Sequence, residues 1–468
     1  MKHEIILKNG VLIDPKNQKF GRLDIGIDQG KVTAVSEELN EAHHIIDAKG
    51  RYVMPGIIDI HMHTTRLLGG PLGYKMMAET GVTTAIDFAG PFMDIVEDLP
   101  AYGSGLNVGG IEGIIPGLSG RRIKTDAPST STLEEELEIS LNGGALGIKL
   151  MGGHYPLTPE ATENAMAIAN NRKAIVAFHA GSKASKSDMT GMREAIELAK
   201  NKRLLLAHIN AYCRGNVDHP LEELKEALQL LMDNPNVYPE SHMAVINGTS
   251  GYCETGIPKS GVTKMSLYRL GFEVTEEGLE EAIRTGFARV HKEQGGVNHL
   301  VQYEEALLHW KQMGTDTGLS FPMNLPTIAV GCAVERVKPG GDFIIPIQST
   351  DGGGIPRNNL LTRMHSLVKL DYLSLEEMVE KISGNPAKMF GLNGKGHLGV
   401  GADADITVFD GETSAATLSL VGGKVNMKDG LTLQDGGTLL CTEEGVETAK
   451  RKNLPYTLAN IANSTMYQ

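Results

Sequence analysis

Tryptophan and cysteine are both scarce in this chain, and each scarcity argues against a class of protein. Trp310 is the only tryptophan, so a carbohydrate-binding barrel with a tryptophan stacking platform has no support. The four cysteines lack Cys-x-x-Cys spacing, which suits reduced thiols in a cytosolic protein better than a disulfide framework. They are Cys213, Cys253, Cys332 and Cys441.

Long apolar runs and an excess of basic residues are also lacking. No stretch approaches the length needed to span a bilayer, and the first residues lack the apolar core of a signal peptide. The formal net charge of -13 opposes binding to nucleic acid or to an anionic membrane surface. We therefore expect a soluble, cytoplasmic protein that acts on a small molecule, with no nucleic-acid and no membrane partner.

The two ends of the chain share a sequence pattern that predicts short strands and tight turns. Apolar residues alternate at strand spacing near both ends, in 5–9, 11–13, 24–27, 31–35, 405–409 and 418–425. Neither end is long enough to form a domain by itself. We predict that 1–53 and 396–468 pair into one small β-sandwich, with a C-terminal tail, and that 54–395 is inserted between them.

The middle of the chain alternates between short apolar runs and longer amphipathic ones. The strand candidates are 56–61, 83–88, 107–115, 147–150, 174–179, 203–208, 236–241 and 342–348, and the helical patterns between them include 132–142, 159–171, 189–201 and 220–233. Repeated β-α units of this kind predict an α/β fold, a (β/α)8 TIM-like barrel, whose active site lies at the carboxyl ends of the strands. A doubly wound open sheet is the alternative.

The alternation breaks once, over about 243–340. This stretch contains helical patterns at 276–293 and 303–313. We interpret it as an insertion near the site that serves as a lid or as an oligomer contact.

Possible metal ligands gather at the carboxyl ends of the predicted strands. The first strand ends in a His-x-His pair, and residues i and i+2 of a strand point to the same face. Any one of these residues alone is as readily a core histidine, a surface lysine or a turn aspartate, but their shared placement around one barrel mouth indicates a metal site. The set is His61, His63, Lys149, His179, His208 and Asp351.

At these residues the chain resembles the metal-dependent amidohydrolase superfamily, which contains hydantoinases, dihydroorotases, allantoinases and the catalytic subunit of urease. The resemblance covers nearly the whole chain. It rests on the motifs at 55–63, 144–149, 384–391 and 399–406. The lysine stretch is typical of the binuclear members, in which the lysine is carboxylated.

The resemblance implies a ligand set and two divalent metal ions. A cationic lysine cannot sit between two dications, whereas a carbamate made from carbon dioxide on Lys149 supplies two anionic oxygens. Nitrogen and oxygen ligands favour zinc, and they also admit manganese, nickel, cobalt and iron. The resemblance implies that His61, His63 and Asp351 hold the buried ion, that His179 and His208 hold the exposed ion, and that Lys149 and a hydroxide bridge them.

Catalytic and substrate-binding roles follow from the same resemblance. Asp351 is expected to act as general base and then to protonate the leaving nitrogen. Tyr155 is a candidate for the oxyanion contact, and His154 is its rival.

Three polar residues near the predicted site are candidates for substrate binding. Asn210 and Arg214 follow His208 and could bind a polar or carboxylate group, and Arg357 is a second possible anion contact. A turn asparagine and a surface arginine are equally ordinary interpretations of the first two. Four further histidines match no position of the resemblance and are expected to be non-ligands: His219, His242, His291 and His299.

The favoured function is a hydrolase that cleaves a C–N bond of a cyclic amide or imide, or of an N-acyl amino compound. One alternative is a heterocycle deaminase that uses a single metal, against which the lysine-bearing fourth strand counts. Another is a non-catalytic barrel homologue, against which the complete set of candidate ligands counts. The resemblance also implies a homo-oligomer, either a dimer or a tetramer.

Overall fold

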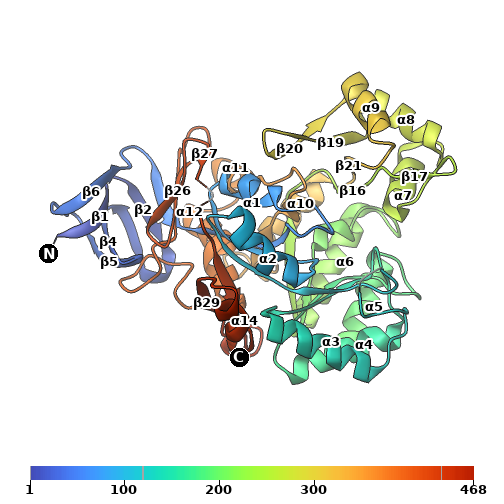
Figure 1. Cartoon of the computed structure of the whole chain (residues 1–468), viewed down its shortest axis with the longest axis horizontal. Coiled ribbons are helices and arrows are strands. Elements are labelled where there is room, and N and C mark those ends of the chain that lie inside the picture. Colours follow the sequence, from blue (N-terminus) through green and yellow to red (C-terminus); the bar gives the residue numbers. More distant parts are fainter. Residues whose placement is uncertain (1, 119–120, 434) are drawn as a thin grey trace.

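The protein has a barrel at its centre, a small β-sandwich on one side and an inserted subdomain on the other. Figure 1 shows this arrangement in a computed structural model, with the N-terminal strands at the left and the insertion at the upper right. The structure describes residues 2–118, 121–433 and 435–468. Within these ranges, no helix is both long enough and apolar enough to cross a membrane.

The β-sandwich is built from both ends of the chain, as predicted. One sheet has the order β5-β4-β1-β6, and the other has the order β27-β26-β25-β24-β7-β2-β3. Their bounds are β1 His3–Lys8, β2 Val11–Asp14, β3 Lys19–Arg22, β4 Asp24–Asp28, β5 Lys31–Ser36, β6 Ala42–Asp47, β7 Tyr52–Pro55, β24 Ile406–Phe409, β25 Ala416–Val421, β26 Lys424–Lys428 and β27 Leu431–Thr432.

The antiparallel pair β7 and β24 joins the two ends of the chain. Val53 lies opposite Val408, and both side chains belong to the buried apolar core between the two sheets. Burial of these alternating residues favours the pairing, because each strand presents one apolar face to the same core. Only Gly56 separates β7 from the first barrel strand, so the sandwich also anchors that strand.

The barrel consists of parallel strands in two connected half-sheets, of orders β23-β8-β9-β10-β28-β29 and β11-β12-β13-β14-β15-β22. Their bounds are β8 Ile57–His63, β9 Val82–Asp87, β10 Asn107–Gly110, β11 Glu112–Ile114, β12 Gly147–Met151, β13 Ile175–His179, β14 Leu204–Leu206, β15 Val237–His242, β22 Ile347–Ser349 and β23 Gly352–Gly353. Ile111 alone separates β10 from β11, and two residues separate β22 from β23. The chain therefore passes directly between the half-sheets at two places, and the parallel strands follow one another as in the predicted (β/α)8 barrel.

A helix follows the strand of each β-α unit of the barrel, where β10 with β11 and β22 with β23 each count as one strand and α10 comes after the insertion. The bounds are α1 Leu72–Ala78, α2 Phe92–Tyr102, α3 Thr130–Gly143, α4 Pro159–Asn171, α5 Met189–Ala199, α6 Pro220–Asp233, α10 Pro326–Val334 and α11 Leu360–Lys369. α4 and α6 match the predicted ranges, α3 begins two residues earlier and ends one residue later than predicted, and α5 ends two residues earlier. The start of α4 was predictable because its sequence carries two start signals. Pro159 occupies its first turn, and Thr158 accepts a hydrogen bond from the Ala161 amide.

The insertion forms a small subdomain with its own apolar core. Its elements are β16 Thr249–Ser250, β17 Cys253–Glu254, β18 Ile257–Pro258, α7 Gly261–Leu270, α8 Glu276–Arg284, β19 Arg289–Gln294, β20 Val297–Val301, α9 Tyr303–Gln312 and β21 Gly318–Ser320. Trp310 is buried in this core and donates a hydrogen bond to the Gly251 carbonyl. Trp310 therefore stabilises the core of the insertion.

The predicted helix at 276–293 is wrong in its second half. Helix α8 ends at Arg284, Gly286 adopts a φ of 81°, and the chain continues as strand β19. A left-handed glycine cannot continue a right-handed helix, and β19 then pairs with β20. The strand expected at 342–348 is also shorter than predicted, since β22 begins at Ile347.

The C-terminal segment makes two different contributions. Residues up to Thr432 complete the sandwich, whereas β28 Thr438–Cys441 and β29 Tyr456–Leu458 join the barrel half-sheet beside β10. Between them lies α14 Val446–Arg451, and before the sandwich strands lie α12 Leu375–Val379, the π-helical turn Glu380–Gly384 and α13 Asn385–Met389. Part of 396–468, which was predicted to form the sandwich and a tail, thus extends a sheet of the barrel.

Candidate metal centre

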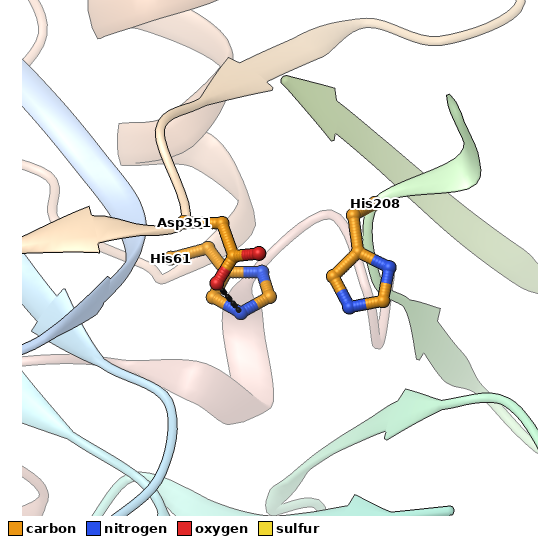
Figure 2. A group of neighbouring side chains, drawn as sticks. All are labelled: His61, His208 and Asp351. Carbon is orange, nitrogen blue, oxygen red and sulfur yellow. Dashed lines mark ion pairs between the residues drawn. The ribbon is translucent and has the colours of Figure 1, made fainter. Parts of the chain in front are cut away.

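Three candidate ligands meet at the mouth of the barrel. His61 lies in β8, His208 follows β14, and Asp351 lies in the turn between β22 and β23. Their ligand atoms all lie within 4.8 Å of one another. Figure 2 shows the Asp351 carboxylate facing the His61 ring, with the His208 ring across from them on a separate segment of the chain. Residues far apart in sequence therefore converge on one point.

The Asp351 carboxylate is held by two histidines and an arginine. Its Oδ1 lies 2.9 Å from His63 Nε2 and 3.4 Å from His61 Nε2, and its Oδ2 lies 2.5 Å from Arg357 Nη2. Its backbone amide donates to the His61 carbonyl at 2.8 Å, which fixes the turn against β8. Burial alone would raise the pKa of Asp351, but Arg357 and the two histidines outweigh it and hold the pKa well below its usual range. This side chain is therefore an anion.

Lys149 points from β12 into the same interior and is almost fully buried. Its Nζ has no hydrogen-bond partner among the described residues and lies 4.6 Å from the centre of the Phe88 ring. Burial lowers the pKa of Lys149 to about 8, although Glu240 and Asp351 act in the opposite direction. A buried amine of lowered pKa is present as the neutral, nucleophilic form far more often than a surface lysine.

His179 and His208 form the second histidine pair. His179 Nδ1 lies 3.1 Å from His208 Nε2, and the far nitrogen of His179 lies 2.7 Å from Ser187 Oγ. Burial lowers the pKa of both histidines well below the ordinary value, which keeps the rings neutral. Two neutral ring nitrogens facing one point are suited to metal ligation.

The donor set fits divalent metal ions. Three buried nitrogen atoms of the candidate ligands have no hydrogen-bond partner among the described residues: His63 Nδ1, Lys149 Nζ and His208 Nδ1. Buried polar atoms without partners are rare in folded proteins, and a cluster of them at a barrel mouth indicates that another group completes their bonding. Imidazole nitrogens together with a carboxylate suit zinc and its neighbours in the transition series.

Comparisons with known proteins agree with this fold. A model described as the amidohydrolase family matches residues 346–422, which include Asp351 and Arg357. The L-hydantoinase of Paenarthrobacter aurescens is 25% identical over 449 residues, which covers 87% of this chain and 85% of that enzyme. Over residues 346–422 the chain is therefore similar to the amidohydrolase family.

Two further relatives extend the comparison. The allantoinase of Bacillus licheniformis is 37% identical over 95 residues, so the match spans only 20% of the length of that relative. The structure of N-acyl-D-glutamate deacylase from Bordetella bronchiseptica, complexed with zinc and a phosphonate inhibitor, superimposes with a TM-score of 0.66 at 16% identity. The superposition covers 93% of this chain and 99% of the deacylase and shows a shared fold.

Glu240 is the main residue of this candidate site that the sequence patterns did not indicate. It lies in β15, is fully buried, and its Oε1 accepts hydrogen bonds from His61 Nδ1 at 2.8 Å and from the His208 amide at 2.5 Å. Its other oxygen accepts from the Ser349 hydroxyl. One carboxylate therefore orients two candidate ligands. The signal available in the sequence was a glutamate inside a buried strand.

His242 and Asp59 are two further residues near the centre. His242 Nε2 lies 3.8 Å from Asp351 Oδ2, although His242 was expected to be a non-ligand. Asp59 accepts from the His61 amide and from Thr350 Oγ1, and burial raises its pKa to about 7. It thus ties β8 to the turn that carries Asp351.

The other three unmatched histidines lie in structural contacts. His219 caps α6, His291 lies 2.8 Å from Ser320 Oγ, and His299 is exposed.

The two candidates for the oxyanion contact differ in their surroundings. Tyr155 packs against an apolar cluster that includes Met151 and Leu118. His154 is exposed, and its ring centroid lies 5.2 Å from that of His179. His154 is thus the one that lies beside a candidate ligand.

The candidate substrate-binding residues also differ in what they contact. Asn210 accepts a hydrogen bond from the His242 amide through Oδ1, while its Nδ2 is buried without a partner among the described residues. Arg357 is committed to Asp351 and to the Ile246 carbonyl. The Arg214 side chain donates hydrogen bonds to the amide oxygen of Asn324.

Proposed function

We propose that this chain is a metal-dependent hydrolase that cleaves a C–N bond of a cyclic amide or imide, or of an N-acyl amino compound. The observation that carries the proposal is the convergence of His61, His208 and Asp351 at the carboxyl ends of the barrel strands. Active sites of this barrel type lie at that end. The L-hydantoinase and the N-acyl-D-glutamate deacylase named above supply the two substrate classes.

In the proposed centre, His61, His63 and Asp351 hold one divalent ion, and His179 and His208 hold a second. Lys149, carboxylated by carbon dioxide, lies between them. Its buried position and its lowered pKa support carboxylation, because the neutral amine is the form that adds carbon dioxide. Zinc is the favoured metal. Bound divalent ions supply Lewis acidity, which activates water and polarises a carbonyl group.

Asp351 is proposed to move the proton. Its low pKa keeps it ionised at neutral pH, so that it can accept a proton from the attacking water as the new C–O bond forms. It then gives this proton to the leaving nitrogen as the C–N bond breaks. Arg357 holds Oδ2, which orients the carboxylate and leaves Oδ1 toward the histidines.

His154 is proposed to contact the carbonyl oxygen as negative charge develops on it. Its exposure at the mouth and its place beside His179 support this role, whereas Tyr155 packs against apolar side chains. We also propose that the enzyme is a cytoplasmic homo-oligomer. The four buried, unpaired cysteines agree with a reducing compartment.

The test is metal analysis of untagged protein grown and purified with bicarbonate and without chelator, together with a mass measurement for a carbamate on Lys149. We expect about two ions per chain by the ligand count and a modified lysine. Hydrolysis of hydantoins, dihydropyrimidines and N-acyl amino acids is then assayed. One ion with an unmodified lysine would favour the single-metal deaminase instead, and no metal would favour a non-catalytic barrel.

A further inference from the structure

Arg214 carries a charge that no carboxylate in the described residues neutralises. It lies six residues beyond His208, after the short 3-10 turn Ile209–Ala211, and is partly buried. Its Nε and Nη2 donate to the same atom, Asn324 Oδ1, at 3.0 and 2.6 Å. An amide oxygen orients a guanidinium without cancelling its charge. Removing an unpaired charge from water is costly, so such a group indicates an anion that arrives from outside.

The rest of the Arg214 environment holds the guanidinium in place. The Arg214 carbonyl accepts a hydrogen bond from Arg269 Nη2 at 2.5 Å, and the next amide, that of Gly215, donates to Glu223 at 2.6 Å. Asn324 is itself fixed, because its Nδ2 donates to the Ala244 carbonyl at 2.9 Å. Arg214 therefore does not reposition freely to find a partner.

One end of the guanidinium remains available. The Nε–Nη2 edge is occupied by Asn324, whereas Nη1 donates to no protein atom among the described residues and keeps contact with solvent. The end formed by Nη1 and Nη2 can therefore receive a carboxylate through two parallel hydrogen bonds, the arrangement that guanidinium groups favour.

The charge of Arg214 acts at the same mouth as the candidate metal centre. Burial, together with Arg269 and Arg357, lowers the pKa of Arg214 to about 10, and Asp351 acts in the opposite direction. Arg214 also adds to the lowering of the His179 pKa, for which burial is the main cause. Such effects require proximity. Arg214 is therefore close enough to Asp351 and His179 for its charge to act at the candidate metal centre.

We infer that the substrate of the proposed hydrolase bears a carboxylate beside the scissile C–N bond, as an N-acyl amino acid does, and that Arg214 binds it. Asn324, which comes from the segment that ends the insertion, is a positioning residue that aims the guanidinium. A neutral cyclic imide would leave the buried charge unpaired and would therefore bind less well. The inference rests on the proposed function.

The test compares matched acids and amides on zinc-loaded, bicarbonate-treated enzyme. The probes are N-acetyl amino acids of both configurations, their C-terminal amides, and the neutral imides hydantoin and dihydrouracil. The variants are Arg214→Gln and Arg214→Lys, with Arg193→Gln as control, because Arg193 lies on α5 in an exposed ion pair with Glu226. Binding of the acids to Asp351→Asn protein, with and without Arg214→Gln, is measured by calorimetry as a second readout.

We expect the acids to exceed the amides by about 10- to 100-fold in kcat/KM, the range for a hydrogen-bonded charged group. Arg214→Gln should remove most of that preference by acting on the acids alone, and Arg214→Lys should be intermediate. If Arg214→Gln does not fold, Arg214→Lys tests the inference instead, because lysine keeps the positive charge but cannot donate two parallel hydrogen bonds to a carboxylate. The control should match the wild type.

Two results would overturn the inference alone, and a third would overturn the proposed function as well. Equal or better turnover of amides and imides would show that the substrate needs no carboxylate, while the proposed hydrolase function would still stand. A parallel loss on acids and amides in Arg214→Gln would show a structural role only. Failure of the metal-loaded enzyme on every C–N substrate would remove the proposed function itself, together with the inference.

Discussion

Replacing Glu240 by glutamine tests how far a residue beneath the metal centre controls it. The substitution preserves size and one oxygen acceptor but removes the negative charge that faces His61 Nδ1 at 2.8 Å and the His208 amide at 2.5 Å. The new amide group would also meet the Ser349 hydroxyl, which must then turn from donor to acceptor. Both candidate ligands would lose an ionic partner at once.

The expected size of the effect follows from these contacts. A hydrogen bond to a charged group contributes about 1.5–3 kcal/mol and a neutral one about 0.5–1.5 kcal/mol. The difference, on the order of 1.5 kcal/mol, corresponds to roughly tenfold weaker binding of the ion held by His61, within the 10- to 100-fold range for carboxylates that orient metal-bound histidines. The protein itself should still fold, because the shape of the side chain is retained.

The assay is competition between the metal-free protein and a fluorescent chelator for zinc, with thermal unfolding measured in parallel. Glu112→Gln is the matched control, because Glu112 is also a buried carboxylate at a barrel strand, paired with Arg121 rather than with a histidine. The control should change stability without changing zinc affinity. Unchanged affinity in Glu240→Gln, or equal losses in both variants, would refute the reasoning.

Three further predictions concern single residues. Lys149→Ala should lose much of the bound metal, with partial rescue by a short carboxylic acid, as measured by elemental analysis; retention of both ions and full activity would disprove the carbamate. Asp351→Asn should keep metal bound while abolishing turnover, since an oxygen ligand remains but the proton carrier is lost, and full activity would contradict its role. Lys381 is buried, donates to the Ile345 carbonyl at 2.6 Å and has a pKa that burial lowers from 10.5 to about 7. Between these pH values the unfolded chain binds one more proton than the folded one, so the free energy of unfolding should rise by about 1.4 kcal/mol per pH unit from this residue. Lys381→Met should remove that rise in denaturant titrations at pH 7.5 and 9, and parallel curves for the two proteins would show that Lys381 is not neutral when folded.

The barrel and the candidate ligands were predictable because their signals are local. His61 and His63 lie two residues apart on one strand, and the alternation of strand and helix places later strand ends at the same mouth. Helix α4 could be bounded to the residue because a threonine cap and a proline mark its start. Patterns of this kind need no knowledge of distant contacts.

The misses share the opposite property. Glu240 can orient His61 only after β15 packs beside it, and His61 lies 179 residues earlier in the chain. No sequence motif indicates this contact. Asn324 lies 110 residues beyond Arg214, so the uncompensated arginine looked like an ordinary surface residue. The helix expected at 276–293 failed because a single glycine, Gly286, reverses the chain inside an apparently periodic stretch.

The pairing of β28 with β10 has a consequence for how the protein is made. Asn107 and Val108 pair with Thr438 and Leu439, which are synthesised about 330 residues later. At 5–20 residues per second, a ribosome takes on the order of 15–70 s to cover that distance. During this interval the outer edge of β10 is open, and an open strand edge invites pairing with other chains. The nascent chain should therefore depend on chaperones most strongly just before its last strands emerge.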